Sequence, residues 1–286
     1  MLEALSHSLS RVCLTALSLA RGFHFTPRTY LSRAMEMVFG RYEESNARLF
    51  DALIRPGDTV VEVGANIGYF TRRYARLAGP RGRVLAFEPN PVVLPILRKN
   101  VRGRPWVSVH PCGLADVRSR LPFYSGSNTA VASSSREYTA RYTADGSGNS
   151  VREYEIEVMP GDVALAEAGV AGVSFIKIDV EGMEIDVLRG LEHTLRSNPE
   201  LVVFCEFNPS ALHYRGASPE DLLQVLLGLG FTPNLVHRGS LEPITTTNLQ
   251  EVCAAFAQAG YADLISYRER AARLSLETLR ETISGR

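Results

Sequence analysis

The 286-residue sequence has no excess of either charge and no paired cysteine motif. Its 31 basic residues are balanced by 31 acidic residues, so the formal net charge is zero. A neutral chain gains little from a polyphosphate partner, which argues against general nucleic-acid binding. No two cysteines are spaced as a CxxC pair, which argues against a zinc ribbon or a redox motif. The four cysteines are Cys13, Cys112, Cys205 and Cys253.

The sequence also lacks an apolar run long enough to cross a bilayer. The longest such run near the N-terminus covers only residues 12–20, whereas a membrane-spanning helix needs about 20 residues. We therefore expect no membrane span and, without a disulfide framework, a cytoplasmic location. Apolar residues instead repeat at steps of three and four, which predicts a helix docked on its own domain. A homodimer or membrane-surface face is the alternative for this stripe of Leu2, Leu5, Leu9, Val12, Ala16, Leu19 and Phe23.

Short apolar strands alternate with helices from residue 56 onward. Strands are predicted at 59–63, 83–87, 106–110, 175–178 and 201–205, and helices at 69–78, from 91, and at 184–195. Helices at 219–229 and 248–259, strands at 231–236 and 262–267, and a charged last helix follow. Such alternation predicts an α/β domain with a mostly parallel sheet and helices on both faces. Ligands of such sheets bind at the carboxyl ends of the strands.

One segment interrupts this alternation. Residues 125–150 are rich in Ser, Thr, Gly and Ala, which predicts a long loop that is either a lid or disordered. The flanking segments 121–124 and 154–158 could pair as an added hairpin. We therefore divide the chain into an N-terminal helical segment (1–45), a main domain (46–270) with a lid or insert at 120–158, and a C-terminal helix (271–286).

The first strand leads into a glycine-bearing loop that runs through Glu62, Gly64, Ala65, Asn66 and Gly68 before the next helix. Glycine permits a sharp turn and a close approach of the backbone to a ligand. The dinucleotide fingerprint GxGxxG is similar, but Asn66 stands where its second glycine belongs. An acid at the strand end disfavours a phosphate and suits a cation. This loop therefore predicts a site for S-adenosylmethionine, which carries a sulfonium and an ammonium group.

Acidic residues follow the next two strands as well. Glu88, with Pro89 after it, ends the second strand 24 residues beyond Gly64. This is close to the spacing of about 20 residues at which an acid accepts hydrogen bonds from ribose hydroxyls. Asp116, after the third strand, either accepts a hydrogen bond from an adenine amino group or forms a turn.

A second acidic segment, at 175–184, supplies candidates for the chemistry. Alternation along the strand puts Lys177 and Asp179 on one face, where Lys177 needs a carboxylate beside it. Asp179, Glu181 and Glu206 should meet at the ligand-binding end of the sheet, with Asp179 preferred as the group that takes a proton. Crowded carboxylates prepare one of them as a general base, although metal binding or a structural role remains open. His213 is the best-placed histidine, Asn208 indicates a turn, and we assign no metal ligand.

Two stretches resemble the FkbM family of S-adenosylmethionine-dependent methyltransferases. They are VEVGANIGYF at 61–70 and IKIDVEG at 176–182, the latter followed by VLRG at 187–190. The likeness covers residues 40–210 and extends more weakly to 267. It implies a class I methyltransferase fold with a Rossmann-like, seven-stranded sheet of order 3-2-1-4-5-7-6, in which the last strand is antiparallel. It implies cofactor contacts at Glu62, Gly64, Asn66, Gly68 and Glu88.

The resemblance further implies O-methylation of a hydroxyl on a sugar or small natural product. The family usually has Asp where this chain has Glu62, and the segment 125–150 matches it only loosely, around residues 133–135. A small-molecule or glycan acceptor is therefore expected, of unspecified identity. Two alternatives remain, namely an NAD-type oxidoreductase and a non-catalytic scaffold that binds a partner through its N-terminal helix.

Overall fold

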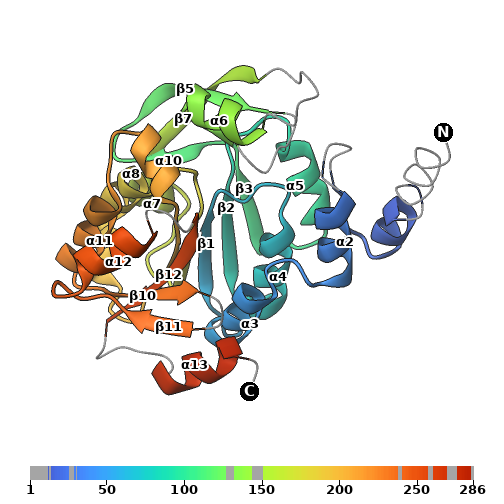
Figure 1. Ribbon diagram of the computed structural model, residues 1–286. Helices are drawn as coiled ribbons and strands as arrows, with labels where there is room; N and C mark the ends of the chain where they lie inside the picture. Colours follow the sequence, from blue (N-terminus) through green and yellow to red (C-terminus); the bar gives the residue numbers. More distant parts are fainter. Residues whose placement is uncertain are drawn as a thin grey trace.

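The computed structural model contains a central sheet of eight strands in the order β11-β10-β12-β9-β8-β1-β2-β3 (Figure 1). The structure describes residues 12, 14–25, 29, 31–126, 132–143, 151–237, 240–256, 260–268 and 276–284. The sheet is formed by β1 (Thr59–Val63), β2 (Arg83–Phe87), β3 (Val107–His110), β8 (Phe175–Ile178), β9 (Val202–Phe207), β10 (Thr232–His237), β11 (Ser240–Pro243) and β12 (Ala262–Tyr267).

The predicted fold class is confirmed, with one strand more than expected. Strands β3, β2, β1, β8 and β9 are parallel neighbours, and β12 inserts antiparallel between β9 and β10. This corresponds to the expected order 3-2-1-4-5-7-6. The additional strand, β11, pairs antiparallel with β10 at the edge, because the chain reverses directly after β10.

Helices cover both faces of this sheet. On one face α3 (Glu44–Leu53), α4 (Tyr69–Ala78) and α13 (Leu276–Ser284) bury an aromatic core against the strands. On the other, a larger apolar core is closed by α7 (Gly161–Glu167), α8 (Glu184–Gly190), α9 (Glu192–Ser197), α10 (Pro209–Tyr214), α11 (Pro219–Gly228) and α12 (Leu249–Phe256).

Two predicted helices differ from the structure at their ends. The helix expected from residue 91 is α5 (Leu94–Asn100), which begins later and thereby keeps Pro95 in its first turn, where proline is tolerated. The helix expected over 184–195 is divided into α8 and α9 at Leu191.

The insert forms a second, four-stranded sheet of order β4-β7-β5-β6, which lies beyond one end of the central sheet (Figure 1). The expected hairpin is confirmed, since β5 (Ser119–Ser125) pairs antiparallel with β7 (Arg152–Pro160). The segment predicted to be a lid or disordered contains β6 (Ala132–Ser133) and the helix α6 (Arg136–Thr143). The short β4 (Gly113–Ala115) pairs with β7 and joins the insert to the main domain.

The N-terminal helix packs on a face other than the predicted one. Residues 14–20 are helical, but Val12, Ala16 and Leu19 of the expected stripe are exposed. Leu14 is buried instead, against Ala34 and Val38 of α2 (Leu31–Phe39). The apolar repeat could not specify which face of the helix is buried, because Leu14 and Leu17 form an adjacent face that is equally apolar. Leu2, Leu5 and Leu9 lie outside the described residues.

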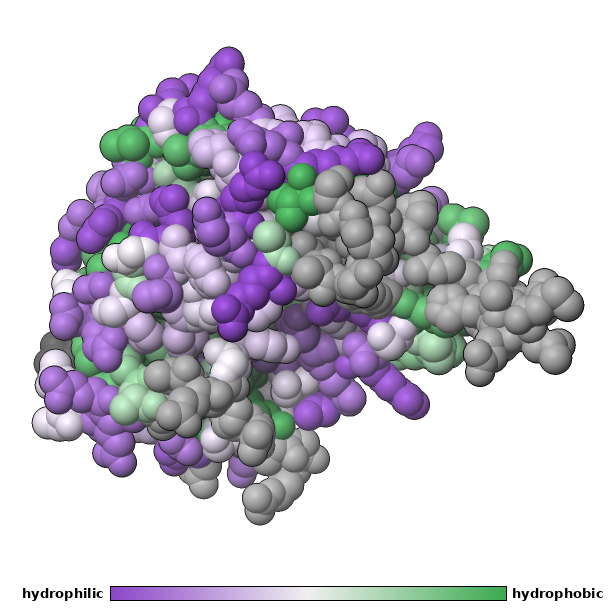
Figure 2. Space-filling view, turned by 45° about the horizontal axis from the view of Figure 1, so that its top comes forward, coloured by the Kyte–Doolittle hydropathy of each residue, from purple (hydrophilic) through white to green (hydrophobic). Residues whose placement is uncertain are grey.

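The surface of the molecule is mainly hydrophilic in the view of Figure 2, with hydrophobic patches on the N-terminal part that projects to the right. Met35 and Phe39 of α2 are large apolar side chains that are exposed. Within the described residues, no helix is both long enough and apolar enough to cross a membrane.

Candidate active site

A cavity of about 450 Å³ lies at the carboxyl ends of the parallel strands. Its floor is formed by the ends of β1, β2, β8 and β9 and the loops that follow them. The insert contributes Phe123, Tyr138 and Ile156 to its wall, and α2 contributes Arg33 and Met37. Chain segments far apart in sequence therefore enclose one space at the end of the sheet where α/β folds bind ligands.

The glycine-bearing loop after β1 holds three residues in the left-handed backbone region, Gly64, Asn66 and Gly68. Gly64 has φ +87°, and a Cβ atom at this position would lie 1.9 Å from the carbonyl oxygen of Asp179. The glycine is thus required by the close approach of two backbones. Asn66 has φ +48°, a conformation that asparagine tolerates better than most residues, which explains why the second fingerprint glycine is dispensable here.

Glu88 is held rigidly at the end of β2. Its Oε2 accepts a hydrogen bond from the amide of Asn66 at 2.7 Å, and its Oε1 accepts one from the amide of Asn90 at 2.8 Å. Burial raises the pKa of Glu88 to about 7, although both amides oppose the increase. Each oxygen keeps a second lone pair, so the carboxylate is oriented to accept hydrogen bonds from a ligand's hydroxyl groups.

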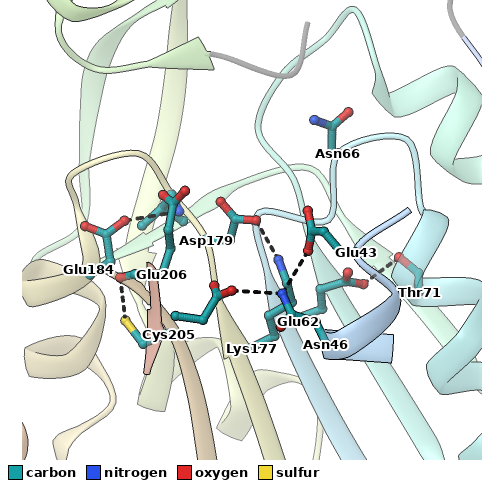
Figure 3. A network of polar contacts seen from close by, with 12 residues as sticks. Glu43, Asn46, Glu62, Asn66, Thr71, Lys177, Asp179, Glu184, Cys205 and Glu206 are labelled. Atoms are coloured by element: carbon teal, nitrogen blue, oxygen red, sulfur yellow. Dashed lines mark hydrogen bonds and ion pairs between the residues drawn. The ribbon is translucent and has the colours of Figure 1, made fainter. Parts of the chain in front are cut away.

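Glu62, Lys177 and Asp179 form a polar row across β1 and β8 (Figure 3). Glu62 pairs with Lys177 in the parallel register, and its Oε2 accepts a hydrogen bond from the hydroxyl of Thr71 at 2.5 Å. The side chain of Lys177 is 4% exposed and lies 2.6 Å from Asp179 Oδ2. Burial raises the pKa of Glu62 to about 8. The carboxylate that the sequence required beside Lys177 is therefore Asp179.

Three carboxylates crowd the opposite side of the cavity. Asp179, Glu181 and Glu206 each place an oxygen within 4.8 Å of the others. Burial raises the pKa of Glu181 to about 8, and burial with the nearby Glu181 and Asp179 holds the pKa of Glu206 well above its usual value. Glu206 Oε2 is closed to solvent and has no hydrogen-bond partner among the described residues. The spacing suits a general base or a divalent cation bound through oxygen.

The insert contacts this acidic group directly. The hydroxyl of Tyr138 in α6 donates a hydrogen bond to Glu181 Oε2 at 2.6 Å, and Ser133 donates one to the Glu181 carbonyl oxygen at 2.9 Å. Asn208 donates to the Tyr138 hydroxyl at 2.9 Å. Glu181 itself has φ +53°, an unfavourable backbone conformation for a non-glycine residue, and such conformations concentrate at functional sites.

The structure brings together most of the residues singled out from the sequence. The residues that line the cavity are Glu62, Gly64, Asn66, Glu88, Pro89, Asp179, Glu181 and Glu206. Ala65 and Gly68 do not line it; Ala65 is buried, and a Cβ atom on Gly68 would lie 2.6 Å from Leu97, so this glycine serves helix packing. Asp116 and His213 are exposed and lie outside the lining, because the chain leads both away from the strand ends.

Sequence reasoning missed several lining residues. Asn208 was interpreted as a turn; it caps α10 through its side-chain oxygen and also contacts the acidic group through its amide. Its position two residues after Glu206, at a strand end, was a usable signal. Tyr138, Arg33 and Tyr261 reach the cavity only through long-range packing, and no local pattern marks them.

The donor set of the cavity fits a nucleoside ligand that carries positive charge. Glu88 offers oriented acceptors for hydroxyl groups, and the lining holds six carboxylates against two cationic side chains. A phosphate would be repelled by this surplus of negative charge, whereas a cation would be attracted. The crowded carboxylates on the other side could accept a proton from a second ligand.

Comparison with known proteins agrees with this arrangement. A family model described as the methyltransferase FkbM domain matches residues 62–233. The chain is 31% identical over 230 residues to the 31-O-demethyl-FK506 methyltransferase FkbM of Streptomyces tacrolimicus, covering 73% of this chain and 79% of that protein. It is 27% identical over 188 residues to the hexuronic acid methyltransferase AglP of Haloferax volcanii, covering 65% and 68%. The solved structure of cofactor-bound Rv0187 from MTB matches with a TM-score of 0.45 and 14% identity, covering 90% of this chain and 88% of that chain.

Proposed function

Because the chain belongs to the FkbM family of S-adenosylmethionine-dependent methyltransferases, we propose that it methylates a hydroxyl group on a sugar or small natural product. The names of two relatives support this acceptor class. One acts on 31-O-demethyl-FK506, and the other is named for a hexuronic acid. The single observation that carries the proposal is the cavity itself, in which an oriented Glu88 and a group of raised-pKa carboxylates face one space.

The cofactor occupies the side of the cavity formed by β1 and β2. Glu88 accepts hydrogen bonds from the ribose hydroxyls, since both of its oxygens are already aligned by backbone amides. Gly64, Asn66 and Pro89 provide the wall, and Ala65 and Gly68 shape the loop from behind. Glu62 and Asp179 supply negative charge for the ammonium and sulfonium groups. Asp116 is exposed, so its proposed bond to adenine requires the cofactor to extend beyond this cavity.

S-adenosylmethionine supplies a methyl group made electrophilic by its sulfonium, and the protein has to position an acceptor and remove its proton. Proximity alone accounts for much of the rate of such a transfer. Among the three crowded carboxylates, we assign Glu181 as the base that takes the proton from the acceptor hydroxyl. Asp179 is engaged by Lys177 at 2.6 Å, whereas the pKa of Glu181, at about 8, suits a base that works near neutral pH. Glu206, whose pKa is held well above its usual value by burial and by Glu181 and Asp179, keeps its proton beside it.

A labelling experiment tests the proposed function. The protein is incubated with methyl-labelled S-adenosylmethionine and, in separate reactions, with hexuronic acids, neutral sugars, hydroxylated macrolides and a host metabolite extract. We expect label in a methyl ether, released only by treatments that cleave ethers and not by mild base. Label in a methyl ester or an amine, with none in an ether, would contradict O-methylation while preserving methyl transfer.

Two matched variants test whether Glu181, rather than a nearby acid, is the base. Glu181→Gln should lower turnover at least a hundredfold and leave the affinity for S-adenosylmethionine within a few-fold. Asp186→Asn, five residues further along, is the control, because Asp186 is partly exposed, pairs with Arg215 and lies outside the cavity lining. Dependence of turnover on Mg²⁺, lost with EDTA, would instead favour the divalent-cation alternative for the same three carboxylates.

A further inference from the structure

The described lining of the cavity has more acidic than basic side chains, which leaves the carboxylate of the cofactor without an obvious partner. The described lining contains Glu43, Glu62, Glu88, Asp179, Glu181 and Glu206, and its only cations are Arg33 and Lys177. S-adenosylmethionine carries a sulfonium, an ammonium and one carboxylate. The surplus of acids suits the two cationic groups, but the carboxylate would be repelled unless a cation meets it.

The glycine-bearing loop cannot provide a full cradle for that carboxylate. Four of its five amide groups are already donated within the protein. Gly64 and Ala65 donate to the carbonyl oxygen of Phe87, Asn66 donates to Glu88, and Gly68 donates to the carbonyl oxygen of Ala65. Loops that bind anions direct successive free amides at the ligand. Four of the amides in this loop therefore stabilise the fold of the loop itself.

Lys177 already forms an ion pair within the protein. Its side chain is 4% exposed and its ammonium lies 2.6 Å from Asp179 Oδ2. The same ammonium stands 5.6 Å above the ring of Phe70 and is flanked in register by Glu62 (Figure 3). A second carboxylate could reach the buried ammonium of Lys177 only by weakening its ion pair with Asp179, which is costly because Lys177 itself is buried.

Arg33 is the cation in the described lining that has no ion pair. Its guanidinium carbon lies 5.6 Å from the ring centroid of Tyr42, and its positive charge opposes the rise in the pKa of Glu181 and of Tyr261. Tyr42 in turn packs edge-on against Tyr69 at 5.4 Å, and Tyr69 is the first residue of α4, directly after the glycine-bearing loop. The guanidinium is thus held over the cavity on the side of the cofactor loop.

The helix that carries Arg33 is anchored rather than loosely attached. The neighbouring Ala34 is 1% exposed and packs with Leu14 and Val38. Farther along the N-terminal segment, Phe23 packs against Ile67 of the glycine-bearing loop. The N-terminal segment and the cofactor loop are therefore parts of one packed unit, which can hold a long side chain in a defined position.

We propose that Arg33 binds the carboxylate of the methionine moiety of S-adenosylmethionine. A guanidinium presents a planar pair of donors that matches a carboxylate, and Arg33 lines the cavity without an ion pair among the described residues. Arg33 lies outside residues 62–233, the region matched by the family model. An N-terminal element that precedes the family domain would then complete the cofactor site of this chain. The inference rests on the proposed placement of the cofactor.

Calorimetry with two ligands tests this role without any acceptor. S-adenosylmethionine and its decarboxylated form differ by the carboxylate alone, so each is titrated into the wild-type protein and into Arg33→Gln. We expect the wild type to prefer S-adenosylmethionine by about 10- to 100-fold, the effect of one charge-assisted contact. Arg33→Gln should lose this preference and bind both ligands with nearly the same affinity. Arg33→Lys should keep part of the preference.

Arg41→Gln is the matched control, because Arg41 is exposed just beyond α2 and does not line the cavity. It should retain the wild-type preference. The inference is overturned if Arg33→Gln retains the preference, or if it weakens both ligands equally, which would indicate a purely structural effect. A wild-type protein that binds neither ligand would overturn the proposed function and this inference together. A wild type that binds S-adenosylmethionine, with an unaltered preference in Arg33→Gln, would overturn this inference alone.

Discussion

The two sides of the cavity are built differently, although both lie at the end of one sheet. On the cofactor side, formed by β1 and β2, Glu88 has both oxygens engaged by backbone amides, one from Asn90 two residues on and one from Asn66 in the loop after the neighbouring strand. On the acceptor side, formed by β8, β9 and the insert, Glu181 is held by Tyr138 from 43 residues away, and Glu206 Oε2 has no partner among the described residues.

This difference reflects two kinds of task. A side that always receives the same cofactor can satisfy its polar groups locally and remain fixed. A side that takes a proton has to keep a carboxylate unsatisfied and its pKa raised, and the surrounding fold has to stabilise that arrangement. The acceptor side therefore relies on contacts between segments that are distant in the sequence.

The largest expected effect comes from a substitution at Gly64, where the backbone of the cofactor side meets the backbone of Asp179. Gly64→Ala would place a Cβ atom 1.9 Å from the Asp179 carbonyl oxygen, at a φ of +87°. We expect a roughly hundredfold or greater loss of affinity for S-adenosylmethionine, measured by calorimetry, because β1 and β8 must separate by more than side-chain movement allows. Gly79→Ala is the control. It also has a positive φ, but a Cβ atom there meets nothing within 4 Å. Equal affinities in the two variants would contradict the close-approach argument.

The cofactor side alone is tested through Glu88. Glu88→Gln should weaken binding of S-adenosylmethionine by about 10- to 100-fold, since an amide accepts hydroxyl hydrogen bonds less well than a carboxylate. In the wild type, affinity should fall as the pH drops below about 7, because the ionised form accepts these bonds and burial raises the pKa of Glu88 to about 7. Calorimetry from pH 5.5 to 8.5 measures both effects.

Asp116→Asn is the control for this prediction, because Asp116 is an exposed acid after the next strand. It should bind S-adenosylmethionine as the wild type does, with the same pH dependence. An Asp116 variant as weak as Glu88→Gln would mean that the cofactor extends past the cavity toward β4.

The acceptor side is tested through stability. The pKa of Glu206 is raised well above its usual value by burial and by Glu181 and Asp179, so the folded protein retains this proton at pH values where the unfolded chain has lost it. Ionisation of Glu206 therefore lowers the free energy of unfolding as the pH rises above about 4.5. Glu206→Gln should raise the unfolding midpoint at pH 8 by several degrees and have little effect at pH 4.

Thermal unfolding of Glu206→Gln at both pH values measures this effect, and Glu200→Gln, which alters an exposed acid, is the control. The affinity for S-adenosylmethionine should stay within a few-fold in both variants. A Glu206 variant that is less stable at pH 8 would indicate that this carboxylate is stabilised by a bound cation.

The smallest expected effect concerns the insert. Tyr138→Phe removes one hydrogen bond to Glu181, worth about 1–3 kcal/mol, without changing the packing of the ring. Hydrogen exchange in residues 132–143 should become faster, while the affinity for S-adenosylmethionine stays within about twofold. Tyr142→Phe is the control, since Tyr142 is 46% exposed and its hydroxyl contacts Ser210 rather than the acidic group. Equal exchange in both variants would argue against the insert being held through Glu181.

On the side of the cavity formed by β1 and β2, the sequence located the lining residues Glu62, Gly64, Asn66 and Glu88, because their determinants are local. A strand, an acid and two glycines lie within a few residues, and Glu88 follows the next strand. Alternation along β8 likewise predicted that Lys177 and Asp179 share a face. Asp116 lies outside the cavity lining for a physical reason, because after its strand the chain leaves the strand ends and enters the insert.

The acceptor side was predicted only as a cluster of acids. Glu181 and Glu206 were found because strands end near them, but Tyr138 reaches Glu181 only after the insert folds over the cavity. The N-terminal helix illustrates the same limit. Its apolar repeat predicted a docked helix, yet the face that docks includes Leu14, because the partner surface on α2 decides the phase.

The hydrogen bonds between the insert and Glu181 also influence which molecules can enter the cavity. Ser133 and Tyr138 donate hydrogen bonds to the backbone and the side chain of the same residue, Glu181, so the insert is attached directly to the residue that we propose as the base. A small acceptor can settle beneath the insert. A bulky acceptor has to separate the two hydrogen bonds first, and it thereby frees the carboxylate that will take its proton. Size selection and readiness for proton transfer are then consequences of a single movement.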